Sequence, residues 1–144
     1  ASAGCLFLEE HCDADKPSTN LIIYGHHMKN GDMFGHLVDY EDHEFYRKHR
    51  FFTFDTIHEH REYQVLSVFR SEAYPEDDTE HFHYYDFIQA KDKAEFDTYL
   101  KEVTQRSQYV TGVTAQYGDE LLTLSTCAYH TEEGRFVVVA KRVK

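Results

Sequence analysis

Two short runs of strand-forming residues near the C-terminus constrain the fold of this chain most strongly. Residues 121–126 and 136–140 are rich in apolar and β-branched side chains, and each run has the length of a strand. A loop of about eight residues, which contains Gly134, separates them. This pattern predicts an antiparallel pair of strands, in which Cys127 and Arg135 face each other across the mouth of the loop.

Four further segments have the composition of strands. Leu6–Leu8 and residues 21–24 are apolar runs, and Gly25 ends the second. Residues 51–54 are aromatic and residues 63–70 alternate with a period of two, so a hairpin is expected between them. The phenylalanines of the 51–54 segment are expected in the hydrophobic core. With the C-terminal pair, the sequence predicts six strands and a mainly β fold.

Helices are predicted at two places. Apolar residues recur with helical spacing between residues 32 and 49, which indicates two short helices or one bent helix. Asp92 followed by Glu95 matches a capping box, and the apolar stripe that follows ends near Ser107. The segment 73–83 is acidic and contains little apolar material, so it has the composition of a solvated loop.

Composition narrows the possible functions. The 144 residues, with a mass of 17.0 kDa, have the size of one domain, which we assign to residues 1–144. Asp and Glu number 26 against 15 Lys and Arg, and the net charge of -11 argues against nucleic-acid binding. The apolar runs near the two ends are far shorter than the roughly 20 residues of a membrane span. Residues 1–10 lack the pattern of a signal peptide.

Three residues at predicted strand ends have the chemistry of a nucleophilic site. A cysteine attacks a carbonyl as the thiolate, which a nearby imidazole or cation favours, and acyl transfer also needs a donor for the developing oxyanion. Cys127, His26 and Arg135 are able to supply these three roles. From spacing alone the same residues also fit an ordinary structural role, so both interpretations stay open at this point.

The residues around these positions resemble a known family. TLSTC at residues 123–127 resembles the cysteine signature of sortases, YGH at residues 24–26 resembles their histidine segment, and RFVV at residues 135–138 resembles their arginine strand. The order and spacing of these segments agree with that family over nearly the whole chain. The helix predicted at residues 92–107 is similar to the insertion that marks class B sortases. The resemblance therefore implies a sortase-type β-barrel with added helices, lacking the first two strands of the family barrel.

The resemblance also implies a role for each site residue. Cys127 would attack the carbonyl of a threonine in a C-terminal sorting signal of the Asn-Pro-x-Thr-Asn kind and form a thioester. His26 would act as general acid and then as general base, and Arg135 would stabilise the oxyanion or hold the substrate backbone. No cofactor and no metal are expected in this chemistry. The residues expected to bind substrate beside the cysteine are Ser125, Thr126 and Tyr129.

By the same resemblance, the protein is a cysteine transpeptidase on the extracellular face of the membrane of a Gram-positive bacterium. It would join a surface protein to an amine of a peptidoglycan precursor or of a pilin. Family members have a membrane segment and two barrel strands before the segment that aligns with Leu6, whereas this sequence begins at Ala1. Either the chain is a fragment or processed piece, or those strands come from another molecule. We therefore expect the missing strands to be supplied by a complementing fragment, by strand exchange between copies, or by residues upstream of Ala1.

Other functions and other sites are also compatible with these residues. A cysteine hydrolase would use the same nucleophile with water as acceptor, and a β-barrel binding module would keep the residues without assembling a site. The pairs His58/His60 and His81/His83 would each place two imidazoles on one face of an extended segment. Exposed loop histidines explain these pairs more simply than a metal site.

Overall fold

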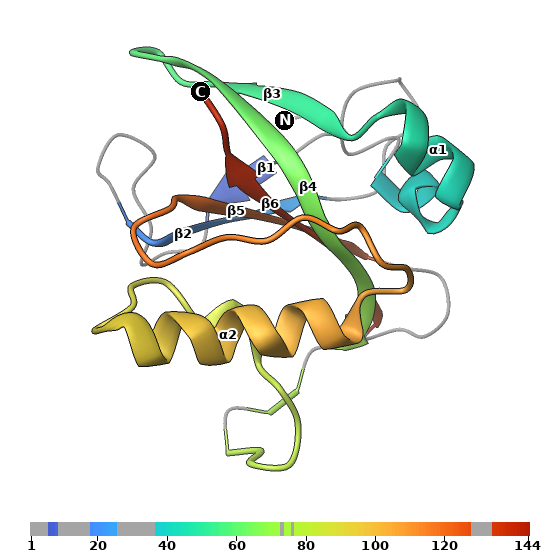
Figure 1. Ribbon diagram of the computed structural model, residues 1–144. Helices are drawn as coiled ribbons and strands as arrows, with labels where there is room; N and C mark the ends of the chain where they lie inside the picture. The colour runs from blue at the N-terminus through green and yellow to red at the C-terminus, as the bar shows by residue number, and fades with distance from the viewer. Residues whose placement is uncertain (1–5, 9–17, 26–36, 73, 76, 128–133) are drawn as a thin grey trace.

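In the computed structural model of the chain, the residues that the structure describes form one sheet of six strands (Figure 1). The structure describes residues 6–8, 18–25, 37–72, 74–75, 77–127 and 134–144. All six strands predicted from the sequence are present, so the mainly β fold is confirmed. In chain order they are β1 (Leu6–Leu8), β2 (Asn20–Gly25), β3 (Phe51–Asp55), β4 (His60–Glu72), β5 (Leu121–Cys127) and β6 (Gly134–Arg142).

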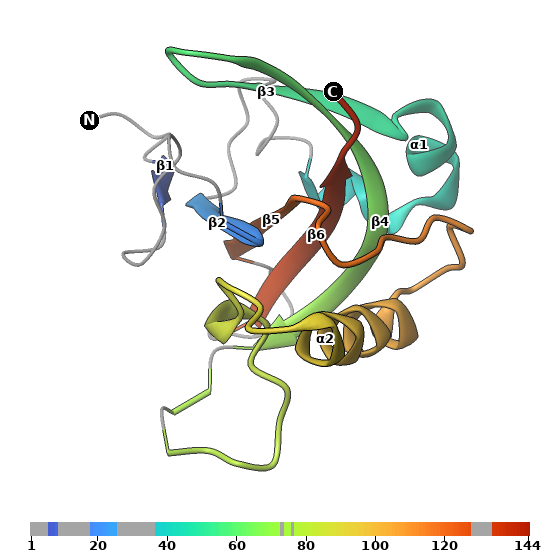
Figure 2. The same cartoon turned by 60° about the vertical axis from the view of Figure 1, so that its left-hand side comes forward.

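The strand order places distant segments of the sequence side by side. Across the sheet the order is β1-β2-β5-β6-β4-β3. Strands β2 and β5 run parallel, and the other neighbouring pairs are antiparallel. The sheet curls, and the long strand β4 follows the curve (Figure 2). The three strands that carry the predicted site, β2, β5 and β6, are therefore consecutive neighbours within the sheet.

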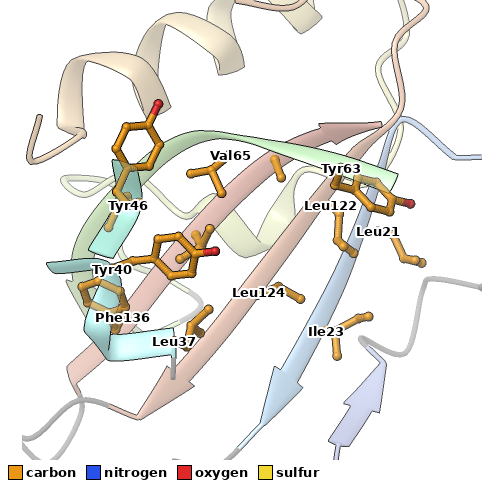
Figure 3. Close-up of a cluster of buried hydrophobic side chains, with 13 residues drawn as sticks. Leu21, Ile23, Leu37, Tyr40, Tyr46, Tyr63, Val65, Leu122, Leu124 and Phe136 are labelled. Carbon is orange, nitrogen blue, oxygen red and sulfur yellow. The ribbon is translucent and has the colours of Figure 1, made fainter. Parts of the chain in front are cut away.

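One face of the sheet carries an apolar cluster that two short helices help to cover. A 3-10 helix, η1 (Leu37–Glu41), contributes Leu37 and Tyr40, and α1 (His43–Lys48) contributes Tyr46 (Figure 3). The strands place alternate side chains on the same face. The sheet residues of this cluster are Leu21, Ile23, Tyr63, Val65, Val68, Leu122, Leu124, Phe136, Val138 and Ala140.

The start of α1 is fixed by a capping residue. The Asp42 carboxylate accepts a hydrogen bond from the backbone N–H of Glu44 at 3.0 Å. The prediction of two short helices in this part of the sequence is confirmed for residues 37–48. Residues 26–36, which the same prediction partly covers, lie outside the described residues.

The opposite face is covered by the longer helix α2 (Lys93–Arg106), which lies along the sheet (Figure 1). Asp92 is its N-cap, and its carboxylate accepts a hydrogen bond from the Glu95 N–H at 2.9 Å, as the capping-box pattern predicts. In the described part of the chain, no helix has the length and apolar character needed to cross a membrane. The side chains that α2 buries against the sheet are Phe96, Tyr99 and Val103.

Two predictions about the hairpin of β3 and β4 need correction. The sequence predicts that all phenylalanines of the 51–54 segment are core residues, but Phe51 is 53% exposed. Because β3 is the last strand in the sheet order, only its alternate side chains, Phe52 and Phe54, pack on the first cluster. The alternation of buried and exposed side chains in β4 also ends early, since residues 65–69 are all buried. Both faces of the sheet are covered there, one by the apolar cluster that includes η1 and α1 and the other by the cluster that includes α2.

Candidate active site

The described strand ends next to the three predicted catalytic positions are neighbours at one end of the sheet. Gly25, the last residue of β2, pairs in parallel with Thr126 near the end of β5. His26 directly follows the first of these residues and Cys127 the second. On the other side of β5, the backbone of Cys127 pairs with that of Arg135 on β6. The predicted pairing of Cys127 with Arg135 is therefore confirmed for the backbone.

Part of the predicted site lies outside the described residues. This is the case for His26, for Tyr129 and for the side chain of Cys127. The contacts of these side chains stay predictions, and so does the selection of His26 as the general acid and base.

Arg135 carries its guanidinium at the opening of β6. The residue is half-buried, and its Nη1 donates a hydrogen bond to the backbone carbonyl oxygen of Gly134 at 2.9 Å. A guanidinium has five N–H donors in a rigid fork, so this bond uses a small part of its capacity. Burial raises the pKa of Tyr85, and the positive charge of Arg135 opposes that rise by favouring the phenolate. The electrostatic influence of Arg135 therefore extends to the loop that precedes α2.

The two residues before Cys127 are buried in the sheet. Ser125 is 0% exposed, and its Oγ shares a hydrogen bond with the Tyr84 Oη at 2.7 Å. Thr126 is 1% exposed, and its Oγ1 has no hydrogen-bond partner among the described residues. The structure thus places both residues at the predicted edge, but with their side chains closed to solvent. Their contact with a substrate stays a prediction.

Tyr84 contacts the predicted site residue Ser125, although no sequence pattern points to it. It opens a short 3-10 turn, η2 (Tyr84–Asp86), between β4 and α2, and it is fully enclosed. Its ring packs edge to face on Phe69 of β4, with the ring centroids 6.0 Å apart. Its hydroxyl meets a serine 41 residues further along the chain. Because this contact joins distant parts of the chain, no pattern of neighbouring residues predicts it. The adjacent tyrosines Tyr84 and Tyr85 are the local feature that marks this segment.

The segment before η2 is organised around one carboxylate. Asp78 accepts hydrogen bonds from His81 Nδ1 at 3.1 Å and from His83 Nε2 at 2.9 Å. The bond from His83 is the main cause that lowers the pKa of Asp78 to about 2, and the same bond raises the pKa of His83. Tyr74 stacks on His81, with ring centroids 4.1 Å apart. The interpretation of this pair as exposed loop histidines is wrong for His83, whose side chain is only 12% exposed.

The other histidine pair also has partners within the chain. His60 Nδ1 pairs with the Asp55 carboxylate across the hairpin. The backbone N–H of His58 donates to Thr56 Oγ1 in the turn at 3.2 Å. Across the described ranges, no group of three or more His, Cys, Asp or Glu side chains is arranged to hold a metal ion.

Relatives of known sequence identify the family. The sortase domain family model matches residues 2–143 of this chain. Sortase B of Listeria monocytogenes is 32% identical over 145 residues, which cover 99% of this chain and 56% of that protein. Sortase B of Staphylococcus aureus is 33% identical over 143 residues, which cover 98% of this chain and 55% of that protein. The chain therefore spans about half the length of these curated relatives.

Solved structures that resemble this chain are also sortase B proteins. The Staphylococcus aureus sortase B-substrate complex matches with a TM-score of 0.80 at 29% identity, over 99% of this chain and 63% of that one. Sortase B from Bacillus anthracis in complex with AAEK1 matches with a TM-score of 0.79 at 35% identity, over 99% of this chain and 62% of that one. The resemblance seen in the strand-end motifs is thereby confirmed. The chain belongs to the sortase family, and its similarity to sortase B proteins assigns it to class B.

Proposed function

We propose that residues 1–144 form the catalytic domain of a cysteine transpeptidase, which cleaves a sorting signal after threonine and joins the acyl part to an amine. The observation that carries this function is the backbone pairing of Cys127 with Arg135, beside the parallel pair of Gly25 and Thr126. This register supports a site in which a thiol, an imidazole and a guanidinium share one edge of the sheet. Membership of the sortase family supports the type of reaction.

In the first step, the Cys127 thiolate attacks the carbonyl carbon of the substrate threonine. The oxyanion of the tetrahedral intermediate accepts hydrogen bonds from the Arg135 guanidinium. The C–N bond of the scissile peptide then breaks, and protonated His26 gives its proton to the leaving amine. The products are a thioester on Cys127, a neutral imidazole and a peptide with a free amino end.

In the second step, the acceptor amine attacks the carbonyl carbon of the thioester. Neutral His26 removes a proton from the attacking nitrogen, the C–S bond breaks, and Cys127 leaves as the thiolate. A new amide bond joins the two proteins, and the site returns to its starting protonation state. Water in place of the amine would give a free carboxylic acid, so transfer and hydrolysis differ only in the acceptor.

The substrates are proposed from the relatives. One similar structure is a sortase B-substrate complex, and another is sortase B complexed with triglycine. These names support a sorting-signal peptide as acyl donor and a primary amine as acceptor. We assign the amine to a peptidoglycan precursor or a pilin. The reaction would take place on the extracellular face of the membrane, with an upstream segment as anchor.

Product analysis tests this function. The protein is incubated with a peptide of the Asn-Pro-x-Thr-Asn kind, with and without triglycine, and the products are identified by mass spectrometry. We expect cleavage after threonine in both cases and a ligated peptide when triglycine is present. Cys127→Ala should abolish both products, whereas Cys12→Ala, a matched loss of a thiol, should keep them. Cleavage by the Cys127→Ala variant, or hydrolysis alone in the presence of triglycine, contradicts the proposed function.

A further inference from the structure

The hydroxyl of Tyr84 joins the segment between β4 and α2 to the strand that ends in Cys127. Its partner, Ser125, lies two residues before Cys127 on β5. In the sheet, Ser125 pairs with Tyr24 on β2 and with Val137 on β6. The hydrogen bond therefore reaches β5 two residues before the proposed nucleophile. Strand β5 lies between β2 and β6, the two other strands of the site.

Both partners of this hydrogen bond are held in place. Tyr84 is 1% exposed and Ser125 is 0% exposed, and their oxygens lie 2.7 Å apart. The Tyr84 ring also packs edge to face on Tyr85, with centroids 5.0 Å apart, in addition to its contact with Phe69. A buried hydrogen bond between two packed groups is stronger than an exposed one and restricts both backbones. Such supporting bonds fix the geometry of a catalytic group on a rigid element.

We propose that Tyr84 is a positioning residue, whose hydroxyl acts through Ser125 to set where Cys127 stands relative to Arg135. The inference rests on the transpeptidation proposed above. Attack on a carbonyl requires a near-attack geometry, and a misplacement of about 1 Å costs on the order of 10²-fold in rate. Loss of the Tyr84 hydroxyl should therefore reduce turnover and thiol reactivity, and it should leave substrate affinity nearly unchanged.

A pair of matched variants tests the role of this hydroxyl. Tyr99 belongs to the same apolar cluster as Tyr84, and its hydroxyl is also buried. Tyr99→Phe therefore removes a buried hydroxyl of that cluster and leaves the bond between Tyr84 and Ser125 in place. We expect Tyr84→Phe to lower kcat by about tenfold or more, with KM within about twofold of the wild-type value. It should slow the alkylation of Cys127 by iodoacetamide by a similar factor, and Tyr99→Phe should change neither rate.

A double variant separates positioning from stability. Tyr84→Phe leaves the Ser125 hydroxyl buried without its partner, which destabilises the fold, whereas adding Ser125→Ala removes both groups and should restore the urea midpoint. If Tyr84 positions the nucleophile, kcat stays low in the double variant although stability returns. Recovery of kcat together with stability overturns the inference, as does a wild-type kcat and alkylation rate in Tyr84→Phe. Failure of the wild-type chain itself to be acylated or alkylated at Cys127 is a distinct result, which overturns the proposed function and this inference together.

Discussion

The backbone of Cys127 pairs with that of Arg135 in the antiparallel ladder between β5 and β6. Directly paired residues in such a ladder have Cα atoms about 5 Å apart. On the opposite side of β5, Gly25 pairs with Thr126, and His26 is the next residue of the chain. Strand β5, which ends in Cys127, therefore lies between two strands of the proposed site. On one side is β2, which leads to the proposed acid and base, and on the other is β6, which carries the proposed oxyanion donor.

Replacing Arg135 by lysine tests the oxyanion donor. Lysine keeps the charge but lacks the planar fork of N–H donors, so Arg135→Lys should lower kcat by about 10²-fold to 10³-fold. Steady-state kinetics with the sorting peptide measures the effect. Arg142→Lys is the matched control, because Arg142 lies at the far end of β6, where it pairs with Glu59 and Glu120. Wild-type kcat in Arg135→Lys would remove the guanidinium from the mechanism.

The pairing of β5 with β6, which brings Cys127 beside Arg135, could be predicted from the sequence because local patterns determine it. The apolar runs before Cys127 and after Arg135 define two strands, and the short loop between them leaves little freedom in the pairing. The capping residues Asp92 and Glu95 similarly define the start of α2 within the sequence itself. These features depend on residues within about ten positions of one another, which a pattern in the sequence can capture.

The supporting contacts could not be predicted because they join distant segments. Tyr84 and Ser125 are 41 residues apart, and their contact exists only once η2 lies on the sheet. The composition of the acidic segment indicates a solvated loop, yet His83 is largely enclosed because it is bound to Asp78. The sequence wrongly predicts Phe51 in the core because composition alone does not show that β3 is the last strand in the sheet.

The pair of Asp78 and His83 predicts a measurable imidazole titration. The hydrogen bond raises the pKa of His83 above its ordinary value of 6.5. Asp78→Asn removes this negative charge and leaves that of Asp86, whose carboxylate lies 3.3 Å from His83 Nδ1, so the pKa of His83 should fall part of the way toward that value, as followed by NMR titration of the ring protons. Asp77→Asn removes the exposed neighbouring charge. This variant is the control, and it should leave the pKa of His83 at its raised value. An unchanged His83 pKa in Asp78→Asn would show that the bond does not form in solution.

The same pair predicts how the stability of the protein depends on pH. Because the pKa of His83 is raised, its contribution is present below pH 6.5 and is lost as the pH rises through the raised value. Because the pKa of Asp78 falls from 3.8 to about 2, its contribution is present above pH 3.8 and is lost as the pH falls toward 2. The difference in urea midpoint between wild type and Asp78→Asn should therefore be largest near about pH 5 and decrease on both sides. A difference that grows steadily toward high pH would contradict this account.

Two phenylalanine substitutions test which aromatic residues form the core. Phe96 on α2 is 0% exposed, whereas Phe51 on β3 is 53% exposed. Truncation of a buried phenylalanine leaves a cavity, so Phe96→Ala should reduce the free energy of unfolding by about 3–5 kcal/mol. Phe51→Ala should cost less than about 1 kcal/mol, because the side chain already contacts water. Urea unfolding measures both, and equal losses would place Phe51 in the core after all.

Trapping the acyl-enzyme tests the central claim most directly. The chain is mixed with a peptide of the Asn-Pro-x-Thr-Asn kind without any acceptor amine, quenched in acid and analysed by intact-protein and peptide mass spectrometry. If Cys127 is the nucleophile, the protein gains the mass of the peptide fragment that ends in threonine. The added mass maps to Cys127, and it is absent from a folded Cys127→Ala variant. An adduct on another residue, or one that persists in Cys127→Ala, would contradict the account of this site.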